Sequence, residues 1–295
     1  MRYLGFLFVA LLVLGCTAEN SIENYTDYVD PKIGTGGHGH VFVGANVPFG
    51  LVQLGPTSIP QEWDWCSGYH DSDSTVIGFS HTHLSGTGIG DLFDITVMPV
   101  TRADLTYARG KENDPESGLW SYADRTKEIA RPGYYSVPLT RYGVTAELTA
   151  TNRVGMHRYT FPASDEAGIV INLMNGGCWD RPTDTFIEPC ADNAVRGYRF
   201  SRGWADDQKV YFYAEFSRPY KDLNIHSIDY KPYYAKADFE TREGEQIMMK
   251  VALSPVSMEN AYENMQTELP GWDFDGTVEE AEDAWDKELG RIRIE

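Results

Sequence analysis

Two glycine-rich segments in the first third of the chain carry the residue types that could do chemistry. Residues 34–40 read GTGGHGH and residues 78–91 read GFSHTHLSGTGIGD. The first segment lacks the Gly–Lys–Ser/Thr ending of a phosphate loop and the strand–GxGxxG–helix setting of a dinucleotide site, so it predicts no nucleotide binding. Its glycines instead allow tight turns that bring imidazole side chains to a surface.

Four histidines in these segments, His38, His40, His81 and His83, allow two interpretations. His81 and His83 are two residues apart, so they share one face of a strand, and four imidazoles form a ligand set that zinc would accept. Alternatively, the imidazoles hydrogen-bond within a loop scaffold or a polyol-binding pocket. We favour the second interpretation, because His-x-His without a His-x-x-x-His helical pair is a moderate metal signal. The sequence alone leaves both interpretations open.

Trp63, Asp64, Trp65 and Cys66 lie between the two segments and suit a sugar ring. An aromatic ring offers a flat apolar face, and a carboxylate accepts hydrogen bonds from hydroxyl groups. The alternative is that both tryptophans pack between a loop and the core. A glycoside hydrolase also needs two carboxyl groups about 5–5.5 or about 6.5–9.5 Å apart. No Asp or Glu pair is distinguished by its spacing, so the pattern assigns no catalytic residues.

Short β-rich stretches follow the two segments and must position them. The expected strands cover residues 93–100, 144–152, 156–161, 168–174, 197–201, 210–216 and 246–253. Small or apolar residues alternate with polar ones at Val144, Ala146 and Leu148, which is the period of a half-buried antiparallel strand. No helix-length amphipathic segment separates these strands. The sequence therefore predicts an all-β fold, a large antiparallel β-sandwich.

The last part of the chain changes to a helical pattern. A shorter helix is expected at residues 259–269. Thr277 followed by Glu280 has the spacing of a capping box, which predicts a second helix from Thr277 to residue 292 with apolar residues three and four apart. The pattern stops about one turn later, so the end of the sequence resembles a cut rather than a natural terminus.

Composition limits the classes of function. The chain has 295 residues, with 44 Asp and Glu against 25 Lys and Arg, and a formal net charge of −19. Hydrophobic residues make up 42%, enough for a core, so an acidic disordered chain is excluded. We expect no nucleic-acid partner, because binding nucleic acid requires a basic surface.

Residues 1–16 have the organisation of a secretory signal peptide that ends in a lipobox. An apolar run at residues 4–14 is too short to span a bilayer, and Cys16 follows it. We expect lipidated Cys16 to anchor the exported protein to a bacterial membrane, in the periplasm or at the cell surface. Residues 17–27 would form a tether, and the lipid would be the protein's only contact with the membrane.

Three cysteines follow the lipobox. Export permits disulfides, and Cys178 could pair with Cys190 to close the loop between them. Cys66 would then remain a thiol that is buried or lines a site.

Six longer motifs cover much of the chain after the signal peptide. They are residues 28–40 (YVDPKIGTGGHGH), 48–56 (PFGLVQLGP), 65–70 (WCSGYH), 78–88 (GFSHTHLSGTG), 197–204 (GYRFSRGW) with Asp207 and Gln208, and 252–261 (ALSPVSMENA). These motifs resemble glycoside hydrolase family 92. The resemblance implies a calcium-dependent, exo-acting α-mannosidase that inverts the anomeric centre. It also implies an N-terminal sandwich of the galactose-mutarotase type, a helical linker and a C-terminal (α/α)6 barrel.

The resemblance implies a sandwich at residues 28–255 and a linker toward the barrel at residues 256–295. In the family, the general acid, the general base and most calcium contacts come from the barrel. We therefore expect no catalytic residue and no metal ligand on this chain, with calcium as a cofactor of the complete enzyme. The barrel would be missing or supplied by a separate polypeptide, so we expect no useful mannosidase activity from the chain alone.

The resemblance also assigns part of a mannose pocket to the sandwich, with a mannose-containing glycan as the partner. The residues that it implies are Phe42, Trp63, Trp65, Cys66, His83 and Asp91. It does not support the pairing of Cys178 with Cys190, which differ from the usual family residues in that loop. Two other functions stay open: a stand-alone carbohydrate-binding lipoprotein, and a metal-binding protein that uses the four histidines.

Overall fold

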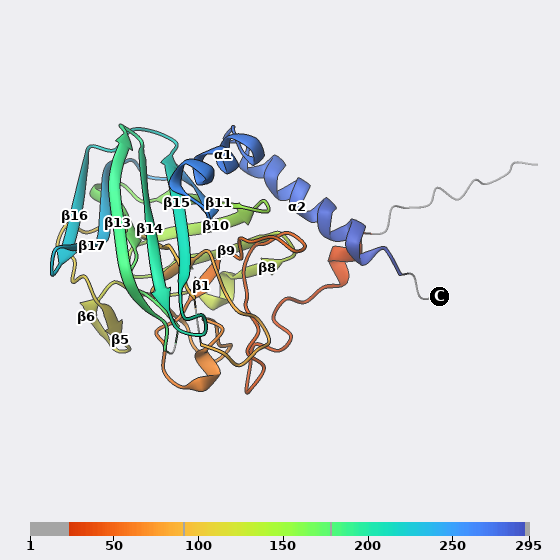
Figure 1. Cartoon of the computed structure of the whole chain (residues 1–295). Helices are drawn as coiled ribbons and strands as arrows, with labels where there is room; N and C mark the ends of the chain where they lie inside the picture. Colours follow the sequence, from red (N-terminus) through yellow and green to blue (C-terminus); the bar gives the residue numbers. More distant parts are fainter. Residues whose placement is uncertain (1–23, 91, 178, 293–295) are drawn as a thin grey trace, which may run out of the picture.

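The computed structural model describes residues 24–90, 92–177 and 179–292. Two large antiparallel sheets enclose the core, and two helices follow at the C-terminal end (Figure 1). The predicted fold class, a β-sandwich followed by helices, is confirmed. The signal peptide with Cys16, and also Asp91 and Cys178, lie outside the described residues. Among the helices of the described part, none is both long and apolar enough to cross a membrane.

The strands form two large sheets and two small ones. In spatial order, the six-stranded sheet contains β1 (Gly55–Thr57), β3 (Gly78–Ser80), β4 (Thr96–Val100), β12 (Ser164–Asn172), β17 (Lys231–Thr241) and β16 (Asp222–Ile228). The eight-stranded sheet contains β13 (Arg181–Ala191), β14 (Ala194–Arg202), β15 (Gln208–Phe216), β18 (Glu245–Ser254), β11 (Val154–Phe161), β10 (Val144–Ala150), β9 (Tyr134–Leu139) and β8 (Ile129–Arg131). The two-stranded sheets pair β2 (Thr75–Val76) with β7 (Ser121–Tyr122), and β5 (Arg109–Lys111) with β6 (Asp114–Gly118).

The core lies between the two large sheets and contains side chains from both. In β10, Val144, Ala146 and Leu148 are buried in this core, whereas Thr145 and Glu147 on the other face are partly exposed. The predicted period of two is therefore confirmed for this strand. The alternation arises because successive side chains of a strand point to opposite faces of the sheet.

Two local expectations about strands are wrong. The strand expected at residues 93–100 begins at Thr96, because Phe93 and Ile95 have φ angles of 65° and 52°, which a regular strand does not allow. β13 was not expected, because Pro182 and Pro189 normally interrupt a strand. It is an edge strand, and its register shifts beside both prolines, so their missing N–H groups are tolerated.

Helices α1 (Met258–Glu268) and α2 (Phe274–Leu289) pack on the outer face of the eight-stranded sheet (Figure 1). Met265 of α1 and Phe274 of α2 join an apolar cluster with Val154 and Met156 of β11. Trp285 Nε1 donates a hydrogen bond to Asn46 O (2.7 Å), which ties α2 to the N-terminal loops. The predicted linker is thus fixed to the sandwich over most of its length.

The second helix begins earlier than the capping-box pattern predicted. The Asp273 carboxylate accepts a hydrogen bond from the Gly276 N–H (3.0 Å), so Asp273 is the N-cap. Thr277 lies inside the helix, and its hydroxyl donates to Asp273 O (2.6 Å). A threonine and an aspartate four residues apart are both good N-cap residues, and only the backbone geometry distinguishes them.

A buried carboxylate, Glu128, holds the N-terminal loops against the sandwich. It accepts hydrogen bonds from Lys32 Nζ (2.5 Å), Arg125 Nη1 (2.6 Å), the Tyr135 hydroxyl (2.6 Å) and the Tyr69 hydroxyl (3.1 Å). Burial on its own would raise the pKa of Glu128, but the Arg125 and Lys32 charges outweigh it and keep the pKa below its usual value. The segments that carry Lys32 and Tyr69 are thereby fixed beside the candidate site.

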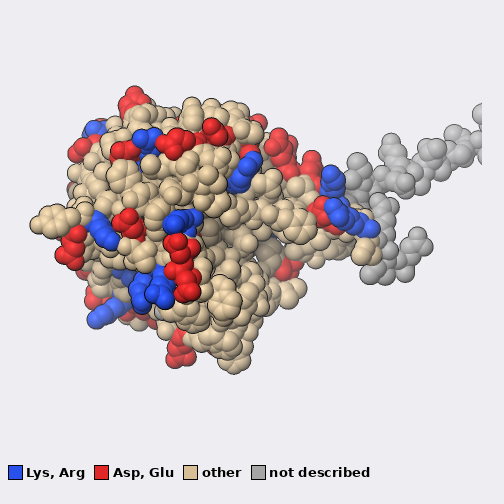
Figure 2. All heavy atoms as spheres, in the orientation of Figure 1, with Lys and Arg blue, Asp and Glu red and all other residues tan. Residues whose placement is uncertain are grey.

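Acidic and basic side chains are interspersed over the face of the molecule that Figure 2 shows. Residues 263–295 contribute 11 acidic and 3 basic residues, a net charge of −8 out of −19. The net negative charge per residue is therefore higher in residues 263–295 than in the rest of the chain, which carries the remaining −11.

Candidate functional site

Three segments that are far apart in the sequence meet at one end of the sandwich, in the orange loops at the lower edge of Figure 1. They are residues 38–42, the 3-10 helix η2 (Trp63–Trp65) and residues 83–90, and we call them the loop cluster. The Gly86 N–H donates to His40 O (2.6 Å). Trp63 Nε1 donates to Gly88 O (2.7 Å). These two bonds join residues 83–90 to both of the other segments.

Asp64 is the carboxylate of the loop cluster. Its Oδ1 accepts hydrogen bonds from His38 Nδ1 (2.6 Å) and His40 Nε2 (3.2 Å). The His38 hydrogen bond is the main reason why the pKa of Asp64 lies below its usual value, so this carboxylate stays ionised at neutral pH. His40 also packs edge-on against Trp63, with 4.2 Å between ring centroids. The aromatic ring and the carboxylate therefore form one rigid unit.

Phe42 and His83 stack with 4.8 Å between ring centroids. Phe42 is partly exposed, whereas His83 is buried and its Nδ1 donates to Ser67 O (3.1 Å). Burial lowers the pKa of His83 to about 4, so its imidazole is neutral at pH 7. The buried His83 ring therefore packs against the inner side of the partly exposed Phe42 ring. Cys66 is a buried thiol in the neighbouring segment.

The two tryptophans of η2 have different surroundings. Trp63 is 52% exposed. Trp65 is less exposed, stacks on His70 (4.3 Å between centroids) and donates from Nε1 to Asp73 Oδ2 (2.7 Å). The packing interpretation therefore holds for Trp65, while Trp63 presents its ring to solvent. Of the predicted pocket residues, Phe42 and Trp63 reach the surface of the loop cluster, and Asp91 lies outside the described residues.

His81 is not part of the loop cluster. Its Nδ1 donates to Ile95 O (2.6 Å), and its Nε2 accepts from His157 Nε2 (3.0 Å), while His157 Nδ1 accepts from the Tyr159 hydroxyl (2.8 Å). All three side chains are buried, and every ring nitrogen has its partner when both histidines are neutral. The four-histidine metal interpretation is therefore wrong, because His81 belongs to an interior hydrogen-bond chain.

Calcium does not fit the residues that this chain brings together. Among the described residues, no group of three or more His, Cys, Asp or Glu side chains converges as a metal site would require. Calcium takes about 6–8 oxygen ligands, whereas the loop cluster offers imidazole nitrogens and one carboxylate that is already hydrogen-bonded.

A buried arginine that the sequence analysis did not single out fixes one side of the loop cluster. Arg199 Nη1 donates to Asp94 Oδ1 (2.6 Å), and its Nη2 pairs with Asp180. Gln208 Nε2 donates to the other oxygen of Asp94 (2.7 Å). Both neighbours of Asp94 have left-handed φ angles, so this network holds a strained turn in place. An arginine at an inward-facing strand position was the signal that could have identified it.

The predicted disulfide is not supported. Cys190 is an exposed thiol without a disulfide partner in the described part of the chain, and Cys178 lies outside the described residues. Cys190 is near the far end of β13, which runs extended from Arg181 at about 3.3 Å per residue, so roughly 30 Å separate the two ends. An extended strand therefore replaces the short loop that the disulfide was expected to close.

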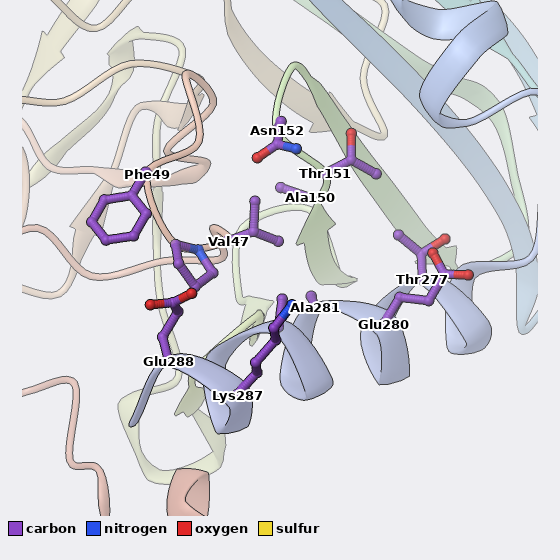
Figure 3. A pocket seen from close by; sticks show the side chains of 12 residues that line it. Val47, Phe49, Ala150, Thr151, Asn152, Thr277, Glu280, Ala281, Lys287 and Glu288 are labelled. Atoms are coloured by element: carbon purple, nitrogen blue, oxygen red, sulfur yellow. The ribbon is translucent and has the colours of Figure 1, made fainter. Parts of the chain in front are cut away.

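A hollow of about 300 Å³ lies on another side of the molecule, between α2 and the loops that face it (Figure 3). Val47 and Phe49 line it from one loop, Thr151 and Asn152 from the β10–β11 turn, and Lys287 from the helix. None of the predicted site residues lines it. This hollow is therefore separate from the loop cluster.

Comparison with known proteins identifies the family. Residues 28–254 match the profile described as the glycosyl hydrolase family 92 N-terminal domain, and residues 260–295 match that of the family 92 catalytic domain. The chain belongs to glycoside hydrolase family 92. The predicted resemblance is confirmed. Most of α1 and all of α2 fall within the stretch that matches the catalytic domain, although both pack on the sandwich.

Solved members of family 92 have the same fold. A family 92 alpha-mannosidase of Bacteroides thetaiotaomicron, solved in complex with mannoimidazole, is 39% identical, with a TM-score of 0.85 over 91% of this chain and 37% of its own. An inverting mannosidase of the same organism is 24% identical, with a TM-score of 0.75 over 92% of this chain and 37% of its own. A protein of Arthroderma benhamiae described as an uncharacterized secreted glycosidase is 25% identical over all of this chain and 41% of its own length. The chain thus spans about two fifths of these relatives.

Proposed function

We propose that this chain forms the sugar-facing wall of an α-mannosidase that removes terminal α-linked mannose from glycans with inversion. The observation that carries the proposal is the exposed Trp63 ring held beside the ionised Asp64 carboxylate. The ring can cover the apolar face of a sugar, and the carboxylate can accept hydrogen bonds from its hydroxyl groups. The similarity to a solved alpha-mannosidase with bound mannoimidazole supports mannose as the sugar.

The catalytic carboxyl groups would come from the family's barrel rather than from this wall. Inversion uses two carboxyl groups about 6.5–9.5 Å apart, one as general acid and one as general base. In the loop cluster as described, Asp64 is the single carboxylate, and two histidines fix it. In this proposal the chain binds and orients the mannoside, while the barrel supplies the acid, the base and the calcium ligands.

Export and lipid anchoring are part of the same proposal. The signal-peptide pattern and Cys16 support them, and the description of the Arthroderma relative as secreted supports export. A glycosidase placed outside the cytoplasm would meet glycans directly.

The test is to incubate the purified chain with calcium and α-mannobiose, and to measure both turnover and binding. We expect no release of mannose at enzyme-like rates, but we expect binding that saturation-transfer NMR detects. Trp63→Ala should abolish this binding, whereas the matched control Phe49→Ala, at an exposed aromatic that lines the separate hollow beside α2, should retain it. Clear turnover would contradict the division of roles, and absence of binding would contradict a sugar-facing wall. A last measurement repeats the binding assay after addition of a family 92 barrel as a separate polypeptide. If binding to the chain alone is tight and the barrel does not strengthen it, the stand-alone carbohydrate-binding protein is favoured.

A further inference from the structure

A buried ion triad is connected to the loop cluster. It consists of Asp94, Arg199 and Asp180, and the single guanidinium group pairs with both carboxylates. We propose that Arg199 is a positioning residue of the sugar-facing wall, because its two partners fix both ends of residues 83–90 of the loop cluster. This inference rests on the proposed function and adds the residue that keeps its binding surface in shape.

The first end of residues 83–90 is held through Asp94. Thr82, which directly precedes the segment, donates from Oγ1 to Asp94 Oδ2 (2.8 Å), while Arg199 Nη1 donates to Asp94 Oδ1 (2.6 Å). Around Asp94, the φ angles of Leu92, Phe93 and Ile95 are 72°, 65° and 52°. Each left-handed residue of this kind costs on the order of 1–3 kcal/mol, so the turn keeps its shape only because surrounding contacts hold it.

The shape of this turn reaches the surface of the loop cluster through two ring contacts. The buried Phe93 ring lies 5.3 Å from the His83 ring, which stacks on Phe42. Gly68 leaves room for both inner rings: its φ is +88°, and a Cβ there would lie 3.0 Å from Phe93 and 3.1 Å from His83. A shift of the turn would therefore move Phe42, which reaches the surface of the wall.

The other end of residues 83–90 is held beside Asp180. The Trp179 N–H donates to Gly90 O (3.4 Å), and Asp180, the next residue, pairs with Arg199 Nη2. Arg199 Nε also donates to Leu173 O (3.1 Å). The guanidinium group is planar and its donors have fixed directions, so it sets the separation of the two carboxylates and of the segments that carry them.

Stability alone does not account for three charged groups buried together. Removing ions from water is costly, and replacing a buried ion pair or triad with apolar residues of similar volume is often neutral or stabilising. Apolar packing has no preferred direction, whereas the bonds of Arg199 to Asp94 and Asp180 do. The contribution of the triad that apolar residues would not supply is therefore the fixed geometry of the two segments.

The test removes the triad without leaving a buried charge unpaired. The full chain with Asp94→Asn, Asp180→Asn and Arg199→Met combined loses all three charges, so we expect it to fold with little change in Tm. Its affinity for α-mannobiose, measured by titration with saturation-transfer NMR, should fall about tenfold. Arg199→Lys keeps the positive charge but lacks the planar fork, so it should give a smaller loss and serves as the readout if the combined variant does not fold.

Two further measurements separate positioning from stability. Amide hydrogen exchange should become faster at His81 and Phe93, whose N–H groups donate to Asp94 O (3.0 Å) and Thr82 O (3.2 Å), and stay unchanged in β10 and β11. The matched control removes another buried ion pair, by Lys236→Met with Asp238→Asn on β17, which pairs with β12 and β16. This control should change neither the affinity nor the exchange at the two amides.

The outcomes separate this inference from the proposed function. If the Arg199 variants bind α-mannobiose as tightly as the unchanged chain does, Arg199 does not position the wall, and the mannose wall stands. If binding weakens only together with Tm, and exchange rises in every strand, Arg199 serves stability and the inference is also wrong. If the unchanged chain binds no sugar, the proposed function is overturned, and the triad then holds a turn that serves no sugar site.

Discussion

At the scale of single residues, buried neutral histidines make this fold sensitive to acid. Burial lowers the pKa of His81 and of His83 to about 4, and it lowers the pKa of His157 as well. A histidine in the unfolded chain titrates near 6.5, so the unfolded state binds more protons between about pH 6.5 and 4. The stabilisation is therefore complete above about pH 6.5 and is lost as the pH falls toward 4.

We expect the free energy of unfolding to fall by about 2 kcal/mol for His81 and by about 2 kcal/mol for His83 between pH 7.5 and pH 5, and His157 should add to this loss. His157→Gln should lower stability at pH 7.5, because it disturbs the bonds to His81 and Tyr159, but it should also reduce the loss on acidification. Urea unfolding at several pH values measures both effects. The exposed Val256→Ala, which removes no titratable group, is the control and should leave the pH dependence unchanged. If the free energy of unfolding falls equally with decreasing pH in His157→Gln and in the unchanged chain, His81 and His157 are not a buried neutral pair.

At the scale of elements, the start of α2 shows how a local pattern can select the wrong residue. Thr277 and Glu280 have the capping-box spacing, yet the Asp273 side chain caps the helix. The reason is that Phe274 joins the apolar cluster on the sheet, so the helix must already have begun there. Packing on the sandwich therefore sets the first turn, and the nearest good cap in front of it is used.

Two substitutions distinguish the observed start of α2 from the one that the sequence predicted. Asp273→Ala should destabilise the protein by about 1 kcal/mol, because the Gly276 N–H loses its partner. Thr277→Val keeps the side-chain volume and should change stability by about 0.5 kcal/mol or less, since a hydroxyl inside a helix contributes little. Thermal unfolding measures both. A larger loss for Thr277→Val than for Asp273→Ala would indicate that the helix begins at Thr277 after all.

At the scale of the whole molecule, the helices and the sandwich form one folded unit although two different family profiles match them. Lys250 illustrates the contact. Its ammonium group is buried, donates to Leu269 O (3.2 Å) and lies 4.2 Å from the centre of the Trp272 ring. Burial lowers the pKa of Lys250, and the group is paired both with Glu215 of β15 (3.6 Å) and with Leu269 O in the helical part. The sandwich therefore depends on residues beyond its last strand.

Deletion of residues 258–295 should destabilise the sandwich. It would expose Val154 and Met156 to water and leave the Lys250 ammonium without Leu269 O. Burial of each large apolar side chain contributes about 1.5–3 kcal/mol, so we expect a total loss of several kcal/mol, a lower Tm and increased binding of a hydrophobic dye. Deletion of residues 292–295 is the control and should have little effect. If the truncated sandwich has an unchanged Tm, the helices do not stabilise it.

Much of this architecture is readable from local patterns in the sequence. The alternation at Val144, Ala146 and Leu148 predicted a sandwich strand, and the helical spacing after residue 258 predicted the linker, because both periods follow from backbone geometry alone. The glycines, histidines and tryptophans of the loop cluster also marked the candidate site. Such patterns need no knowledge of distant partners.

Partners that are remote in the chain required the folded structure. His81 meets His157 across 76 positions, and Arg199 meets Asp94 across 105, so no spacing rule separates the interior His81 from the exposed His38 or gives Arg199 its role. The same holds for Trp179, whose backbone N–H donates to Gly90 O in the loop cluster. Hydrogen bonds and ion pairs depend on distances in space, which the order of residues specifies only after the chain has folded.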